Sequence, residues 1–259
     1  MAITLRSPRE IELMRKAGRV VAEVLSKLKE AAKPSVNTAQ LDLLARQVAA
    51  DAGAENLFLG VKASASQRPF PGAICASINE QVVHGIPSNE AVLREGDIIS
   101  IDYGAKLAGY CADAAITVGV GEVSEVNRRL MEVTKGALDI AIAGARPNVK
   151  WSAIAGRMQR FVESAGFSVV RELVGHGIGR QMHEEPQVPN YVSRELLEND
   201  FTLAEGFVFA VEPMINVGTS AIRTLRDGWT IVTRDGKCSA HFEHTIVITK
   251  GGCEVLTAG

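Results

Sequence analysis

Five ionisable residues constrain this chain more than any other feature: Asp102, Asp113, His176, Glu212 and Glu243. Each lies in or beside an apolar run that is typical of a β-strand, where an unpaired charge is costly to bury. Four carboxylates and one imidazole that converge in one core need cations between them. The set suits two divalent ions bridged by carboxylates, and such a centre is suited to hydrolysis.

The two aspartates flank a predicted hairpin. Two β-rich runs, one containing Asp102 and the other Asp113, flank a short stretch that ends in Gly109, which is a hairpin signal. A turn centred between Leu107 and Ala108 would place Asp102 directly opposite Asp113, with their Cβ atoms about 4.5–5.5 Å apart. Like charges at that spacing repel each other, and a bound metal would reverse the sign of the interaction.

Each of these residues also has an ordinary structural explanation. The two aspartates could be exposed strand or turn acids, and Glu212 could be a turn acid at the end of a strand. Glu243 would share a face with His241, and that face could simply be open to solvent. His176 lies between two glycines, which lets the backbone approach a ligand or a metal closely. The glycine spacing around His176 does not fit a dinucleotide-binding motif.

Composition and charge exclude several classes of protein. The 259 residues are 46% hydrophobic and 22% charged, as expected of one large domain or two small ones with a sizeable core. A net charge of −2 favours neither nucleic acid nor an anionic membrane as a partner. We find no apolar signal core at the N-terminus and no run of transmembrane length. The four cysteines form no Cys-x-x-Cys pair, which favours a reducing cytoplasm over structural zinc or a disulfide framework.

Apolar spacing predicts four helices, the first of which begins after the capping box of Ser7 and Glu10. The other three are expected around residues 41–48, over about 125–143 and around 154–162. A shift of 113 residues brings the second helix onto the fourth, together with the flanking prolines and glycines. This match indicates an internal duplication within one domain of residues 1–259, with halves of about 8–120 and 121–259.

The order of the elements indicates an α+β fold, because runs of helices are followed by runs of strands in each half. We expect an antiparallel sheet with helices on its outer face and the metal site in a central cleft. His84 and His183 lie in turn-like contexts, where either could hydrogen-bond a substrate or transfer protons. The acids near them are expected to be solvated surface or turn residues: Glu80, Glu90, Glu184 and Glu185.

Six blocks, in order over nearly the whole chain, resemble the type I methionine aminopeptidases. They are Val-His84-Gly-Ile-Pro, Ser-Ile-Asp102-Tyr-Gly, Cys-Ala-Asp113, Gly-His176-Gly-Ile-Gly-Arg-Gln-Met-His183-Glu-Glu-Pro, Val-Glu212-Pro-Met and Phe-Glu243-His-Thr. The resemblance implies the pita-bread fold with two pseudo-symmetric halves. It also implies two divalent metal ions (Co²⁺, Mn²⁺, Fe²⁺ or Zn²⁺), of which one tightly bound ion can suffice.

The resemblance assigns a role to each site residue. Asp113 and Glu243 would bridge both metals, Asp102 would complete one, and His176 with Glu212 would complete the other. Glu212 would also accept the proton of the attacking water. His183 would hydrogen-bond the substrate carbonyl or developing oxyanion, and His84 would lie near the scissile nitrogen and the leaving amine. The methionine pocket implied by the match contains Phe70, Cys75, Met182 and Trp229.

The implied activity is removal of the initiator methionine from nascent polypeptides when the second residue is small (Gly, Ala, Ser, Thr, Pro, Val or Cys). The implied protein is a cytoplasmic monomer of the short bacterial form. It could associate with the ribosome, and we expect no membrane partner and no nucleic-acid cofactor. Three departures stand out. The loop over residues 62–69 is longer than usual, Met182 replaces a frequent Phe, and His241 replaces a frequent Gln.

Three other functions are compatible with parts of the sequence. Prolidases and aminopeptidases P share the fold and the ligands, but they carry an extra N-terminal domain, for which a first helix at Ser7 is expected to leave no room. A binding protein on this fold would be expected to have lost ligands, and all five are present. A nucleic-acid-binding module would need a basic patch or an aromatic platform.

Overall fold

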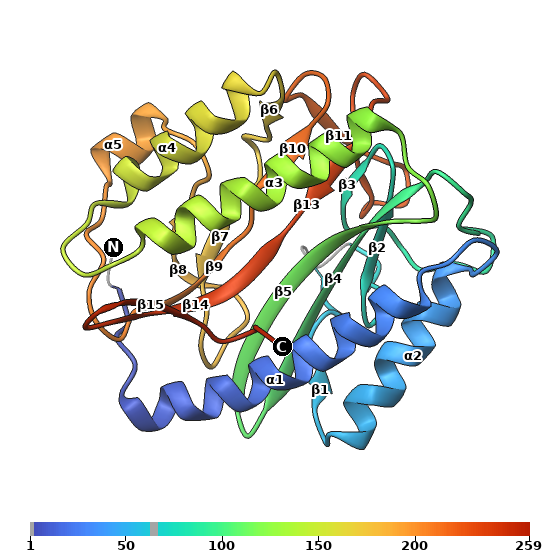
Figure 1. The fold of residues 1–259 in the computed structure, drawn as a ribbon. Helices are drawn as coiled ribbons and strands as arrows, with labels where there is room; N and C mark the ends of the chain where they lie inside the picture. Colours follow the sequence, from blue (N-terminus) through green and yellow to red (C-terminus); the bar gives the residue numbers. More distant parts are fainter. Residues whose placement is uncertain (1–2, 63–66) are drawn as a thin grey trace.

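The computed structural model describes residues 3–62 and 67–259. Its four long helices lie along one side of a large curved sheet (Figure 1). They are α1 (Pro8–Ala31), α2 (Thr38–Asp51), α3 (Glu125–Gly144) and α4 (Trp151–Ser164), and a short α5 covers Arg194–Glu198. Among the helices of the described residues, none is both long enough and apolar enough to cross a membrane. Helices packed on a largely antiparallel sheet confirm the predicted α+β class.

The large sheet has nine strands. Seven lie in the order β1-β4-β5-β14-β9-β7-β8, while β2 pairs with β4 and β15 pairs with β14. Their bounds are β1 Glu55–Asn56, β2 Cys75–Ile78, β4 Ile98–Leu107, β5 Tyr110–Gly119, β7 Gly175–Gly177, β8 Glu184–Val188, β9 Val208–Val211, β14 Glu243–Thr249 and β15 Gly252–Val255. Two three-stranded sheets stand beside it. They contain β13 (Ser239–His241), β10 (Met214–Asn216) and β6 (Ser168–Val169), and β11 (Ile222–Thr224), β12 (Ile231–Thr233) and β3 (Gln81–Val83).

Local capping signals explain where the first helices begin. Ser7 accepts a hydrogen bond from the Glu10 backbone while the Glu10 side chain accepts one from Ser7, and Pro8 opens the helix. Asn37 and Gln40 form a second capping box at the start of α2. Each box satisfies backbone N–H groups that the helix itself leaves unpaired. The predicted start at Ser7 is therefore confirmed.

Each half of the chain has its own apolar core. Helices α1 and α2 pack on β4 and β5 through residues such as Val21, Leu41 and Ile101. Helices α3 and α4 pack with β9 and β14 through residues such as Trp151 and Phe209. The predicted shift of 113 residues carries both ends of α2 (Thr38–Asp51) onto both ends of α4 (Trp151–Ser164). Origin of the two halves by duplication stays a prediction.

The β4–β5 hairpin has a different register from the one predicted. Its two-residue turn is Ala108-Gly109, since Leu107 pairs with Tyr110. Both turn residues have positive φ, 51° and 82°, which suits the mirror-image turns whose twist matches that of the strands. The predicted turn lay one residue too early, because it did not give Gly109 the second turn position. As a result, Asp102 faces Ala115 and not Asp113, as the register shows.

Candidate active site

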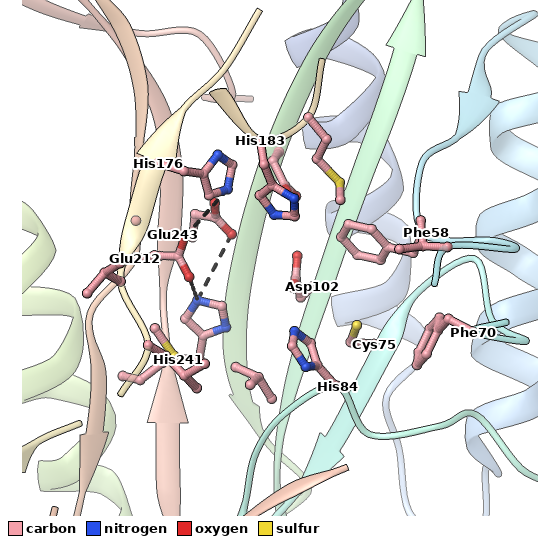
Figure 2. A pocket seen from close by; sticks show the side chains of 18 of the residues that line it. Phe58, Phe70, Cys75, His84, Asp102, His176, His183, Glu212, His241 and Glu243 are labelled. Atoms are coloured by element: carbon pink, nitrogen blue, oxygen red, sulfur yellow. Dashed lines mark ion pairs between the residues drawn. The ribbon is translucent and has the colours of Figure 1, made fainter. Parts of the chain in front are cut away.

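The five ionisable residues come from five strands that are neighbours in the sheet. Asp102 lies on β4, Asp113 on β5, Glu243 on β14 and His176 on β7, and Glu212 directly follows β9. The sheet therefore gathers residues up to 141 positions apart in the sequence onto one cleft, as Figure 2 shows. The structure confirms the prediction that these five residues converge, since all of them line one cavity.

Strand alternation directs these side chains away from the helices. Ile101 and Tyr103 are fully buried in the core beneath α1 and α2. Successive side chains of a strand point to opposite faces, so Asp102 points to the other face of the sheet. The register correction preserves this arrangement, because Asp113 faces Gly104, which lies on the same side of β4 as Asp102. The two aspartates are thus diagonal neighbours on one face.

The spacing of the donor atoms fits metal coordination. One ligand atom from each of Asp113, His176 and Glu243 lies within 4.8 Å of the others. Nε2 of His176 lies 3.6 Å from Oε1 of Glu212. Two ligands bound to the same ion at about 2.1 Å each are separated by at most about 4.2 Å, so only small movements would close this set around a cation.

Several buried carboxylate oxygens have no hydrogen-bond partner among the described residues. They are Oδ1 of Asp102, Oδ1 of Asp113 and Oε1 of Glu243. Buried polar atoms are nearly always paired, so three orphan oxygens in one cluster require an explanation. Carboxylate and imidazole donors suit divalent ions, and such ions would satisfy these oxygens. The donor set therefore fits a divalent metal centre.

Burial perturbs the protonation of the whole cluster. It raises the pKa values of Asp102, Glu212 and Glu243 well above their usual range, and neighbouring carboxylates raise them further. It also raises the pKa of Asp113 to about 7. Four carboxylates cannot all be ionised at this spacing without cations, and bound cations would reverse the effect. Desolvation lowers the pKa of His176 to about 4, with a smaller contribution from His183.

One cavity of about 630 Å³ contains all of the predicted site residues. Its apolar end is formed by a cluster of Phe58, Phe70, Cys75 and Trp229, with Met182 packed against it. The Phe70 and Trp229 rings meet edge to face at 5.2 Å. Cys75 pairs with Asp102 in the β2–β4 register, which places this apolar end directly beside the carboxylates. The predicted pocket residues are therefore brought together, and Phe58 is added to them.

The two predicted accessory histidines line the same cavity from opposite sides (Figure 2). The His183 ring lies 4.3 Å from the His176 ring, nearly perpendicular to it. The His84 ring lies 6.2 Å from the Trp229 ring. His84 has a positive φ of 59°, a conformation that is uncommon for residues other than glycine and that often occurs at functional sites.

His241 belongs to the cluster more closely than its sequence position indicated. It is 2% exposed, and its Nε2 lies 3.9 Å from Oε2 of Glu212 and 4.0 Å from Oε2 of Glu243 (Figure 2). Neither ring nitrogen has a hydrogen-bond partner among the described residues. Its place two residues before Glu243 predicted a shared face with that residue. The proximity to Glu212 arises from the pairing of β10 with β13, in which Met214 lies opposite His241, and no local signal shows this pairing.

Glu184 and the first residue of the loop over residues 62–69 lie at the cavity. Glu184 is not a solvated turn residue as predicted, because it forms an ion pair with Arg6 and accepts two backbone hydrogen bonds. The sequence could not show this, since the partners are 178 residues apart. The longer loop predicted over residues 62–69 lies partly outside the described residues. Val61 and Lys62, the described residues at the start of this loop, line the cavity.

Comparison with known proteins places this chain in a family. Residues 12–250 match Metallopeptidase family M24. The chain is 46% identical over 257 residues to a methionine aminopeptidase from Aquifex aeolicus, covering 99% of each chain. It is also 46% identical to methionine aminopeptidase 1 from Bacillus subtilis over 98% of this chain and 99% of that protein.

Solved structures agree with the sequence comparison. A methionine aminopeptidase from Thermotoga maritima superposes with a TM-score of 0.94 at 39% identity, covering 100% of both chains. A prolidase from Pyrococcus furiosus reaches a TM-score of 0.76 at 20% identity and covers 98% of this chain and 65% of that one. The second likeness shows a shared fold alone, which is the predicted pita-bread fold. On sequence and structure together, the chain belongs to the methionine aminopeptidases of metallopeptidase family M24.

Proposed function

We propose that this protein is a metal-dependent exopeptidase that removes N-terminal methionine when the second residue is small. The observation that carries the proposal is the meeting, in one cavity, of a carboxylate-rich donor cluster and an apolar pocket of aromatic and sulfur-bearing side chains. The cluster can receive a free α-amine and the pocket can receive a methionine side chain, so a peptide would bind by its N-terminus.

The metal would be held by the five residues on the adjoining strands. We assign all five as ligands: Asp102, Asp113, Glu212 and Glu243 would bind through carboxylate oxygens, and His176 would bind through an imidazole nitrogen. Orphan oxygens on three of these residues support the assignment. When bound, the divalent ions supply Lewis acidity, which lowers the pKa of an attacking water and polarises the scissile carbonyl.

Glu212 would accept the proton of the attacking water. Its carboxylate lines the cavity and its backbone carbonyl accepts a hydrogen bond from the buried side chain of Asn190, which fixes the end of β9. A general base has to lie within hydrogen-bond reach of the proton that it removes. Glu212 lies on the cavity wall between His176 and His241, where a water held in the cluster would be within reach.

His183 and His84 would act on the substrate and not on the metal. Burial lowers the pKa of His84 to about 4, so its ring is neutral near pH 7. A neutral imidazole still donates one N–H, and it adds no positive charge beside the metal centre. His183 would donate to the oxygen of the scissile carbonyl as it gains negative charge, and His84 would lie at the leaving amine.

The methionine side chain would occupy the apolar end of the cavity. A thioether is polarisable and makes favourable contacts with aromatic ring edges, which Phe58, Phe70 and Trp229 offer. Trp229 is fixed by a hydrogen bond of 2.9 Å from its indole N–H to the carbonyl of Arg68. We propose that the space for the second residue is narrow, which would restrict that residue to small side chains.

Peptide cleavage tests the proposal directly. Metal-loaded protein is incubated with Met-Ala-Ser, Met-Leu-Ser, Leu-Ala-Ser and a Xaa-Pro peptide, and the released amino acid is quantified. We expect rapid release of methionine from Met-Ala-Ser and slow cleavage of the other three. Failure to release methionine, or faster cleavage of the Xaa-Pro peptide, would refute the proposal.

Nascent polypeptides are the physiological substrates in this proposal, because newly made chains begin with methionine. This substrate places the protein in the cytoplasm, and we propose that it acts there as a monomer that can meet chains at the ribosome. Light scattering of the purified protein and cosedimentation with ribosomes test these two points separately.

A further inference from the structure

The connection between β7 and β8, residues 178–183, carries His183 and Met182 to the cavity. It has no regular secondary structure, so its shape depends on a few hydrogen bonds. The carbonyl of Gly179 accepts from the backbone N–H of Cys111 at 2.7 Å, and that of Gln181 accepts from Gly179 at 3.0 Å. These two hydrogen bonds help to hold the segment that carries His183.

Glu184 makes further contacts that hold this connection. Its Oε1 accepts hydrogen bonds from the backbone N–H groups of Arg180, at 2.9 Å, and Gln181, at 3.2 Å. Its backbone pairs with Gly177, the residue after His176. Glu184 thus holds the middle of the connection through its side chain and the residue before its start through its backbone, directly beside His183.

The second oxygen of Glu184 is paired with Arg6, from the segment that precedes α1. The Arg6 side chain is only 7% exposed and that of Glu184 is 20% exposed. The Arg6 backbone N–H donates to the carbonyl of Gly206 at 2.7 Å, and Leu5 bridges to Phe207. The N-terminal segment is therefore attached to the residues just before β9, the strand that Glu212 directly follows.

The connection wraps closely around the Arg6 guanidinium. A Cβ atom at Gly179 would overlap the guanidinium group, so glycine is needed for this approach. Nε of Arg6 is buried and has no hydrogen-bond partner among the described residues, so the ion pair with Glu184 is the main compensation for its burial. Removal of either partner would leave an uncompensated charge in a confined space.

We propose that Arg6 and Glu184 form a positioning pair. The pair holds residues 178–183 in place and thereby orients the His183 side chain toward the substrate. The proposal rests on the proposed function, in which His183 contacts the scissile carbonyl. Without Arg6, the Glu184 carboxylate would turn toward solvent and release the amides of Arg180 and Gln181. His183 would then lose its fixed position while the metal-binding cluster remained intact.

Steady-state kinetics on Met-Ala-Ser provide the first test. We expect Arg6→Ala to lower kcat by about 10- to 100-fold with little change in KM, because misplacement by about 1 Å can cost that much. Arg6→Lys should recover part of the loss, and Glu184→Gln should fall in between because it keeps an acceptor for the amides. Arg15→Ala is the matched control, since Arg15 pairs with Glu254 and neither residue lines the cavity. An unchanged kcat in Arg6→Ala would overturn the proposal.

A double-mutant cycle with His183 distinguishes an effect of Arg6 on the position of His183 from a general disruption of the active site. In a His183→Ala background, Arg6→Ala should cause almost no further loss, because the residue through which it acts is absent. A loss as large as that in the wild-type background would overturn the proposal. Metal affinity measured by titration calorimetry should be unchanged by Arg6→Ala.

Hydrogen exchange provides a readout that does not depend on turnover. Arg6→Ala should speed exchange of the Arg180 and Gln181 amides by at least about 10-fold, while amides of β4 and β5 keep their protection. Unchanged exchange at these two amides would overturn the positioning pair even in an inactive protein. Failure of the wild-type protein to release methionine would instead refute the proposed function.

Discussion

Asp102 and Asp113 lie diagonally across the β4–β5 hairpin, with carboxyl groups close enough to interact directly. Burial first, and then the charge of Asp113, raises the pKa of Asp102 well above its usual range. In a sheet the favourable pairs carry opposite charges, so this pair is destabilising in the absence of a cation. Repulsion between the two carboxylates therefore destabilises the hairpin, and bound divalent ions would offset this repulsion.

Metal removal should destabilise the protein more at pH 8 than at pH 5.5. Burial raises the pKa of Asp113 from 3.8 to about 7, so the folded metal-free protein keeps a proton that the unfolded chain has released. The stability from this proton is complete below about pH 4 and is lost as the pH rises through about 7. Bound cations compensate for the ionised carboxylate.

Thermal unfolding with metal or with a chelator, at both pH values, measures this effect. For a domain of this size, 1 kcal/mol corresponds to a shift in Tm of about 2–4 °C. A metal-dependent difference in Tm that is equal at the two pH values, or larger at pH 5.5, would contradict the prediction.

Replacing Glu212 with Gln should lower kcat by about 10²–10⁴-fold, because the amide cannot accept the proton of the attacking water. The shape of the side chain is kept, so circular dichroism and Tm should remain close to those of the wild type. Metal content measured by atomic emission distinguishes loss of the base from loss of a ligand. A near-normal turnover with bound metal would refute the assigned role.

Replacing His183 with Ala should lower kcat by about 10²–10³-fold, the usual cost of one oxyanion donor. The side chain is at the mouth of the cavity and holds no core packing, so the fold should survive. Met182→Leu is the neighbouring control, since it keeps apolar volume on the same segment. A loss of similar size in both variants would argue against a specific role for the imidazole.

His241 should tune the metal centre without being essential. The substitution His241→Gln keeps a polar group beside Glu212 and Glu243, and we expect turnover to stay within about 10-fold of wild type. His241→Leu leaves both carboxylates beside an apolar side chain, and metal affinity should fall by about 10–100-fold. Calorimetric titration of the metal-free proteins should show metal affinity decreasing in the order wild type, His241→Gln, His241→Leu. Equal affinities in all three would show that His241 does not act on the centre.

Replacing Phe70 with Ala should weaken the selection of methionine. Phe70 is 3% exposed and packs against Trp229, so its loss opens the apolar end of the cavity. Removing a buried aromatic contact costs about 1.5–3 kcal/mol, which corresponds to about 10–100-fold in kcat/KM for Met-Ala-Ser. The informative measurement is the ratio to Leu-Ala-Ser, which should fall. A fall in both rates with a constant ratio would place Phe70 outside the pocket.

Sequence predictions were most accurate where the signal lies within a few neighbouring residues of the chain. The start of α1 was predictable because Ser7, Pro8 and Glu10 define it within four residues. The hairpin between β4 and β5 was also predictable, but its register was wrong by two, because one turn residue was misassigned. Strand alternation nevertheless kept Asp102 and Asp113 on one face, since the error was an even number of residues.

The sequence by itself determined the kinds of side chain at the site, the start of α1 and the α+β class, because these depend on residue chemistry and on patterns within a few turns. The tertiary structure alone decided that His241 faces Glu212 and that Arg6 reaches Glu184. Strand order and side-chain packing bring these residues together from positions far apart in the chain. No local propensity encodes such a meeting, because its free energy comes from burial and pairing that exist only in the assembled fold.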